Sequence, residues 1–125
     1  MSVWAVVVAA GQGERLGLGR PKAFAPLGGR VLLAECLGRL DACESIDAIV
    51  LVAPAGWEEP AILLAEELGA GKVTACVAGG TRSRAESVRI GVAEVPPEAR
   101  VIIVHDAARP LVSDEVVARV LAPCA

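Results

Sequence analysis

Residues 9–22 bring glycines and cations together directly after an apolar run, a combination that suits the binding of phosphate groups. Gly11 and Gly13 allow the backbone to approach a ligand closely and to adopt positive φ values. Backbone amides that are exposed in such a loop can bind phosphate oxygens. Arg15 and Lys22 add positive charge to a chain whose formal net charge is −3. The segment therefore predicts a phosphate-binding loop in which Arg15 and Lys22 are the cationic groups.

Three other interpretations of this loop compete with phosphate binding. A dinucleotide-binding GxGxxG loop is disfavoured because Leu16 stands at the third glycine position, and because the second apolar run ends at residues 52–54 (VAP) without an acidic residue. A Walker A loop is disfavoured because Gly71 and Lys72 precede a strand and no Ser or Thr follows the lysine. The third interpretation is a surface turn with solvated charges, which would be preferred if the glycines stood alone.

A second polar segment begins with a glycine pair, Gly79 and Gly80, after the third apolar run. It leads into a helix that is predicted to begin at Arg84. The glycines permit a close approach of the backbone, and the N-terminus of a helix favours an anion or the polar edge of a base. The alternative is an ordinary turn between a strand and a helix, with Ser83 as the N-cap residue.

A third polar segment, residues 105–110 (HDAARP), follows the fourth apolar run. A carboxylate at the end of a buried strand suits Mg²⁺, which prefers one or two carboxylates together with phosphates and waters. We therefore assign Asp106 to magnesium, and we assign mainly structural roles to His105 and Arg109. The alternative is that Asp106 pairs with Arg109 and caps the turn.

Apolar runs alternate with helical patterns along the whole chain. Strands are predicted at residues 3–8, 48–52, 73–77 and 101–104, and helices at residues 32–40, 58–68, 84–95 and 113–121. This alternation predicts an α/β fold of the Rossmann-like, doubly wound type: a mostly parallel sheet with helices on both faces. We expect one domain over residues 1–125 that is incomplete at its C-terminus. Ligands bind at the carboxyl ends of such strands, so we expect the three polar segments to meet there.

Composition excludes several classes of function. Aromatic residues make up 2% of the chain and the net charge is −3, which disfavours nucleic-acid binding. The N-terminal apolar run is too short for a membrane span and lacks the basic residues of a signal peptide, so we expect a cytoplasmic protein. The four cysteines, at positions 36, 43, 76 and 124, form no CxxC pair, which disfavours a zinc site and indicates apolar free thiols.

Four motifs give the chain a resemblance to a known family: AAGxGxRLG at residues 9–17, PK at 21–22, GGxxSRxxSV at 79–88 and HDAARP at 105–110. The sequence resembles the 2-C-methyl-D-erythritol 4-phosphate cytidylyltransferases of the non-mevalonate isoprenoid pathway. The first motif is shared with many nucleotidyltransferases, whereas the last two are more specific. Ribitol-5-phosphate cytidylyltransferases are similar, with an HDAVRP-like sequence at the last motif.

The resemblance implies a fold of the nucleotide-diphospho-sugar transferase type and the transfer of CMP from CTP to 2-C-methyl-D-erythritol 4-phosphate, with release of pyrophosphate. It implies that Arg15 and Lys22 stabilise the transition state and that Asp106 binds Mg²⁺. It also implies a CTP-binding set that comprises Ala9, Ala10, Gly11, Gly13, Gly79, Gly80, Thr81 and Ser87.

Members of the resembled family are longer than this chain. Their later part supplies the arm of a homodimer and the residues that hold the acceptor phosphate, and neither maps onto the 125 residues. Two alternatives therefore stay open. One is a cytidylyltransferase for ribitol 5-phosphate or another sugar phosphate, and the other is a truncated nucleotide-binding module without turnover.

Overall fold

The computed structural model describes residues 2–10, 22–24, 26–27 and 30–107. Its elements in chain order are β1 (Val3–Val8), η2 (Lys22–Phe24), β2 (Pro26–Leu27), β3 (Arg30–Val31), α1 (Leu32–Ala42), β4 (Ala48–Ala53), α2 (Glu58–Leu68), β5 (Val73–Ala78), α3 (Arg84–Val92) and β6 (Val101–Asp106). Four strands form one sheet in the order β5-β4-β1-β6, and every neighbouring pair is parallel. β2 and β3 form a separate antiparallel pair.

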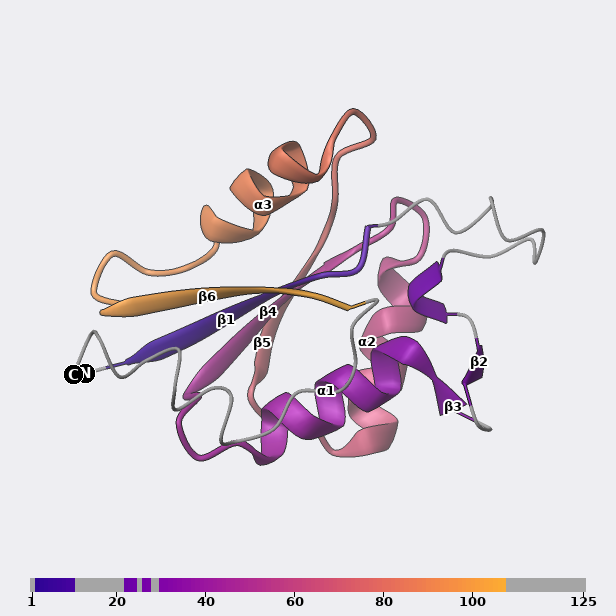
Figure 1. Ribbon diagram of the computed structural model, residues 1–125, viewed down its shortest axis with the longest axis horizontal. Coiled ribbons are helices and arrows are strands. Elements are labelled where there is room, and N and C mark those ends of the chain that lie inside the picture. Colours follow the sequence, from indigo (N-terminus) through magenta and orange to yellow (C-terminus); the bar gives the residue numbers. More distant parts are fainter. Residues whose placement is uncertain (1, 11–21, 25, 28–29, 108–125) are drawn as a thin grey trace.

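Helices cover both faces of the sheet, as Figure 1 shows, with α1 and α2 on one face and α3 on the other. Successive side chains of a strand point to opposite faces, so each strand contributes to two layers of core. Val7 and Leu51 pack in the cluster that includes α1 and α2. Val6 and Val52 pack in the smaller cluster against α3. The doubly wound parallel fold predicted from the sequence is therefore confirmed.

Most predicted elements recur with small changes at their ends. The helix predicted at residues 84–95 ends at Val92, because the next residues form turns in which Glu94 N–H donates to Gly91 O and Val95 N–H donates to Val92 O. Pro96 and Pro97 follow this turn. The helix predicted at residues 113–121 lies outside the described residues.

α3 lies unusually close to the sheet at Gly91. A Cβ added there would stand 2.5 Å from Val6 Cγ1 and 2.6 Å from Val52 Cγ2, distances that a side chain does not tolerate. Glycine at this position lets the helix backbone rest directly on β1 and β4. The same close packing fixes the height of the helix over the carboxyl ends of these strands.

The thiols of Cys36 and Cys76 both have pKa values above the ordinary value. Cys36 is fully buried in the core, and burial, together with the nearby carboxylate of Asp106, raises the pKa of its thiol to about 12. Burial, with a contribution from Glu58, raises the pKa of Cys76 to about 11. Both thiols therefore stay protonated at neutral pH.

We expect native Cys36 to resist alkylation by iodoacetamide at about pH 8, because the thiolate is the reactive species. The rise from the ordinary value of 9.0 to about 12 lowers its thiolate fraction about a thousandfold. Timed labelling with peptide mass spectrometry, with and without denaturant, measures the effect. Labelling of native Cys36 at the rate of the denatured protein would contradict this assignment.

Across the described residues, no helix is both long enough and apolar enough to cross a membrane.

Candidate functional site

The polar segments predicted to form the site begin at one edge of the sheet, where the parallel strands end. Three backbone hydrogen bonds tie these segments, at or near their first residues, to neighbouring strands. Ala9 N–H donates to Val52 O at 2.8 Å, and Gly79 N–H donates to Ala53 O at 2.7 Å. Ala107 N–H donates to Val8 O at 2.9 Å. The exits of β1, β5 and β6 therefore share one rim, as the topology required.

The first and second segments touch at Gly79. A Cβ added to this glycine would overlap the Cβ of Ala10, and it would stand 2.9 Å from Ser87 Oγ and 3.0 Å from Val52 Cγ1. Gly79 is therefore required by close packing between segments that are far apart in the sequence. Two residues that the resemblance assigned to CTP, Ala10 and Gly79, lie against each other.

Ser87 holds the backbone of Gly80 from the first turns of α3. Its side chain is fully buried. Gly80 N–H donates to Ser87 Oγ at 3.0 Å, and the Ser87 hydroxyl lies 3.4 Å from Gly80 O, to which it donates. The resemblance implied that Ser87 contacts CTP, and the structure shows that this hydroxyl is bonded to both backbone groups of Gly80. Thr81 follows as an exposed residue.

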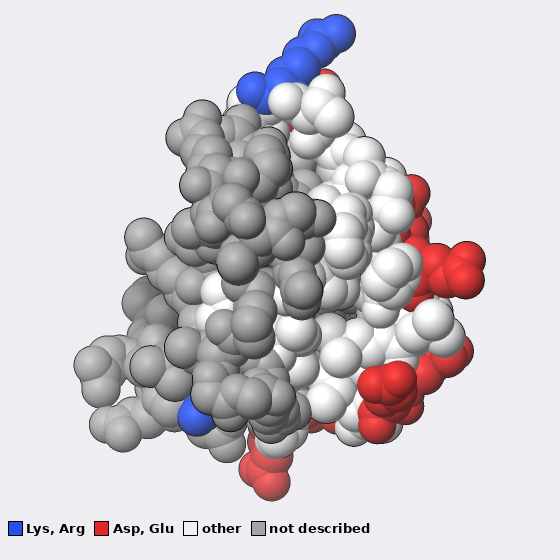
Figure 2. Space-filling view, turned by 90° about the vertical axis from the view of Figure 1, so that its right-hand side faces the viewer, with Lys and Arg blue, Asp and Glu red and all other residues white. Residues whose placement is uncertain are grey.

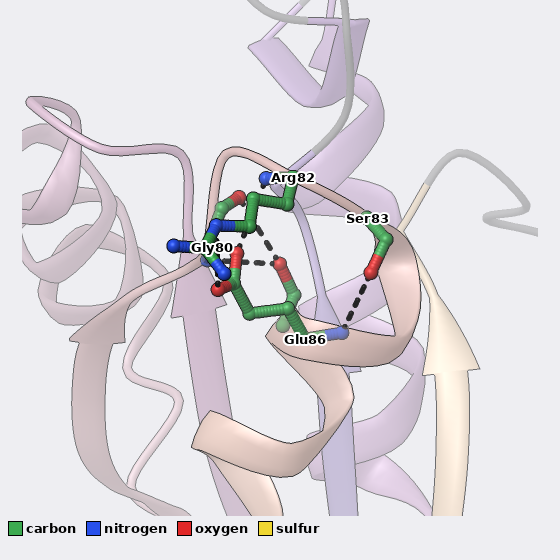
Figure 3. Close-up of polar contacts among 5 residues, drawn as sticks. Gly80, Arg82, Ser83 and Glu86 are labelled. Carbon is green, nitrogen blue, oxygen red and sulfur yellow. Dashed lines mark hydrogen bonds and ion pairs between the residues drawn. The ribbon is translucent and has the colours of Figure 1, made fainter.

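The N-terminus of α3 carries a capping arrangement (Figure 3). Ser83 Oγ accepts a hydrogen bond from Glu86 N–H at 3.1 Å, which confirms Ser83 as the N-cap residue. Glu86 Oε1 accepts from Arg82 N–H at 3.1 Å, and Glu86 Oε2 lies 4.0 Å from Arg82 Nε. Glu86 was not among the predicted residues, although its position three residues after Ser83 is the signature of a capping box.

The carboxylate of Glu86 changes what this helix end can bind. An unoccupied helix N-terminus favours anions, because its backbone amides and dipole present positive charge. Here a negative side chain already lies over the first turn and bonds the loop before it. This negative charge weakens the preference for an anion, and Arg82 Nε, 4.0 Å from Glu86 Oε2, partly offsets it, so an anion and the polar edge of a base both remain compatible with this helix end.

Asp106 lies at the carboxyl end of β6, directly opposite Val8 in the register of the sheet. Its carboxylate is half-buried, and its charge reaches the thiol of Cys36 on α1. His105 is the register partner of Val7 on the same strand pair. The predicted magnesium residue therefore stands beside the start of the glycine-rich segment.

One carboxylate at this position fits magnesium. Within the described part of the chain, no group of three or more His, Cys, Asp or Glu side chains is arranged to hold a metal ion. The described side chains therefore do not surround a metal ion by themselves. Mg²⁺ commonly needs only one or two carboxylates, because phosphates and waters complete its octahedral shell. Arg109, the alternative partner of Asp106, lies outside the described residues.

The cationic residues of the first loop are placed only in part. Gly11, Gly13 and Arg15 lie outside the described residues. Lys22 begins the short helix η2, which is anchored by buried Phe24. The rings of Phe24 and Trp57 lie 4.8 Å apart between centroids. This contact attaches η2 to the turn that follows β4, and so brings the backbone of Lys22 to the rim where the strands end.

Charge is unevenly distributed on the side of the molecule toward which the strands run. Figure 2 shows acidic side chains at the right and lower margins of this side, whereas the described surface in the middle of the view is mostly uncharged. Among the described residues, acidic side chains do not gather in the middle of this face.

Comparisons with known proteins agree on one family. The family model for 2-C-methyl-D-erythritol 4-phosphate cytidylyltransferase matches residues 3–125. A protein of that name from Streptomyces coelicolor is 41% identical over 118 residues, which cover 94% of this chain and 44% of the relative. Another of that name, from Nocardia farcinica, is 41% identical over 120 residues, covering 96% and 50%. The chain thus spans about half the length of the curated relatives it matches.

Solved structures of enzymes with the related synthase name are among those that resemble this chain. The 4-diphosphocytidyl-2C-methyl-D-erythritol synthase from Anaerococcus prevotii superposes with a TM-score of 0.82 at 25% identity, over 98% of this chain and 51% of that one. A second structure with that enzyme name has a TM-score of 0.75 at 26% identity, over 98% and 54%. The shared architecture includes the four-stranded parallel sheet.

Proposed function

The chain belongs to the 2-C-methyl-D-erythritol 4-phosphate cytidylyltransferase family, and from that membership we propose that its protein transfers CMP from CTP to 2-C-methyl-D-erythritol 4-phosphate. Pyrophosphate is the second product. The observation that supports this proposal most directly is the shared rim, where the exits of β1, β5 and β6 are bonded to neighbouring strands. A nucleotide lying across this rim would contact all three polar segments at once.

The proposed reaction is a displacement at phosphorus. A phosphate oxygen of the acceptor attacks the α-phosphorus of CTP, a new P–O bond forms, and the bond to the β-phosphate breaks. Because the attacking oxygen is already anionic, no general base is required. Catalysis then consists of holding the two substrates in line and offsetting negative charge in the transition state. Arg15 and Lys22 are the residues to which we assign that charge.

The nucleotide would lie in a defined direction along the rim. We place its base at the loop of Gly79, Gly80 and Thr81, which the family resemblance assigns to CTP and which Ser87 and Glu86 hold by hydrogen bonds. We place its phosphates toward Asp106 and the glycine-rich segment, which begins at Ala9. When bound, Mg²⁺ would supply positive charge that orients the triphosphate. Asp106 is the described residue that would hold it.

Release of pyrophosphate tests the proposal. A full-length enzyme that contains this chain should release pyrophosphate from CTP when 2-C-methyl-D-erythritol 4-phosphate is added, and calorimetry with Mg²⁺ should show that CTP binds more tightly than ATP, GTP or UTP. Release with ribitol 5-phosphate alone would identify the related cytidylyltransferase instead. Binding of CTP without any release would identify a nucleotide-binding module. The 125-residue chain, measured alongside, shows which of these properties it retains.

The magnesium assignment makes a separate prediction. We expect Mg²⁺ to strengthen binding of CTP to the wild-type protein, and we expect Asp106→Asn to remove most of that gain, because the amide keeps the shape of the side chain and loses its charge. Calorimetric titration of CTP with Mg²⁺ and with EDTA measures both effects. Equal strengthening by Mg²⁺ in the two proteins would show that another group holds the ion.

Two further properties of the whole protein stay predictions. The family resemblance predicts a homodimer, which light scattering of the full-length protein measures. The N-terminal sequence predicts a cytoplasmic protein, which cell fractionation measures.

A further inference from the structure

We propose that Glu86 is a positioning residue for nucleobase selection, acting through the backbone of Gly80, Thr81 and Arg82. The inference rests on the proposed function, since it assumes that the base of CTP lies at this loop. Glu86 touches no part of the reaction itself. Its effect would reach the base only through the loop that its carboxylate holds.

The direction of the Glu86 side chain is the first observation. In an ordinary capping box, the glutamate at the third helical position bonds the backbone N–H of the N-cap residue. Here the N-cap is Ser83, but Glu86 bonds the N–H of Arg82, one residue earlier in the loop. The carboxylate therefore extends past the end of the helix and fastens the loop that leaves β5, as Figure 3 shows.

Contact with Gly80 is the second observation. A Cβ added at Gly80 would overlap the carboxyl group of Glu86. The glutamate side chain thus occupies the space that a side chain at position 80 would need. From the other direction, the hydroxyl of Ser87 bonds both N–H and C=O of Gly80 at 3.0 Å and 3.4 Å. Glu86 and Ser87, consecutive residues of α3, therefore fix the orientation of the loop at residues 80–82.

Fixed backbone groups are what selection between cytosine and uracil needs. The two bases differ at the 4-position, where cytosine carries an amino donor and uracil a carbonyl acceptor, and at N3, which accepts in cytosine and donates in uracil. A site discriminates between them when its own polar groups cannot reorient to satisfy the wrong base. Glu86 is suited to this role because its side chain is only 28% exposed, whereas its partner Arg82 is 88% exposed. The glutamate is the more buried member of the pair.

The expected effect is on nucleotide binding and not on the chemical step. In the full-length enzyme, we expect Glu86→Ala to raise the KM for CTP about tenfold, since one hydrogen bond to a charged group is lost. We expect kcat to stay within about twofold, because the cations at the phosphates are unchanged. The ratio of CTP affinity to UTP affinity should fall. Glu86→Gln keeps an oxygen that accepts from Arg82 N–H, and it should restore most of the affinity.

A matched control separates this effect from a general loss of stability. Glu67 is an exposed glutamate of α2, on the opposite face of the sheet, and Glu67→Ala should leave KM and selectivity unchanged. Thermal unfolding of each variant measures the folded fraction. If Glu86 only stabilised the fold, Glu86→Ala would lower kcat in proportion to the folded fraction and would leave KM and the ratio of CTP to UTP affinity unchanged.

The outcomes distinguish this inference from the proposed function. If wild-type protein binds CTP in preference to UTP and Glu86→Ala does the same, the role of Glu86 is overturned and the proposed function stands. If Glu86→Gln is as impaired as Glu86→Ala, the hydrogen bond to Arg82 is not the route, and the inference also fails. If wild-type protein shows no preference for CTP, the proposed function fails and this inference fails with it.

Discussion

Replacing Lys22 or Arg15 by alanine in the full-length enzyme should lower kcat about 10²–10³-fold, by analogy with the loss of one donor that stabilises a developing oxyanion. The phosphoryl group gains negative charge toward its leaving oxygen as pyrophosphate departs, and a fixed cation offsets that charge. A group that acts mainly in the transition state lowers kcat and kcat/KM together. Steady-state kinetics with saturating CTP measure the effect.

The position of the charge, and not its sign alone, determines the expected loss. Arg39 is an exposed cation in the last turn of α1, and α1 ends near the start of β4, at the opposite edge of the sheet. Arg39→Ala removes the same charge and should leave kcat within about twofold, as surface substitutions away from a site generally do. Near-normal turnover in both Lys22→Ala and Arg15→Ala would remove these residues from the mechanism.

Gly79→Ala should damage the site by overpacking. The new methyl group would meet the side chains of Ala10, Ser87 and Val52 at the point where two polar segments touch. Insertion of a methyl group into a packed site generally costs about 1–3 kcal/mol. Because the backbone at Gly79 begins the loop proposed to bind the base, we expect weaker binding of CTP as well. Urea unfolding measures the first effect, and calorimetry measures the second.

Gly71, in the turn between α2 and β5, provides the control. A Cβ added to Gly71 would have no neighbour within 4 Å, and its φ lies outside the left-handed region. Gly71→Ala should therefore leave the free energy of unfolding within about 0.5 kcal/mol of the wild-type value. Comparison of the two variants separates close packing from the general effect of replacing a glycine. Gly79→Ala with wild-type stability and wild-type CTP affinity would refute the packing argument.

Much of the fold follows from local patterns in the sequence. The helix predicted at residues 58–68 matches α2 residue for residue, since Gly69 supplies a left-handed C-cap with φ of 67°. The run of valines at residues 3–8 matches β1 because its two faces are both buried. The short pair β2 and β3 was not predicted, since strands of two residues carry no periodicity.

The sequence predicted the place of a site residue where that place depends on the order of the strands. It did not predict the side-chain contacts within the site. Asp106 could be placed at the rim because it ends an apolar strand. The sequence did not reveal that Ser87 would bond Gly80, because a nearby serine and glycine indicate no particular hydrogen bond. The contact of Phe24 with Trp57 joins segments on either side of α1, and nothing local to either residue specifies it.

The pairing of β1 with both β4 and β6 has a consequence for how the protein assembles during synthesis. As the chain leaves the ribosome, β1 can join β4 early, but its other edge must wait for β6, whose register begins with Val3 opposite Val101. Pairings between such distant segments form slowly, and an unpaired edge is open to other chains in the meantime. Until β6 is made, one edge of β1 therefore stays open to pairing with other chains.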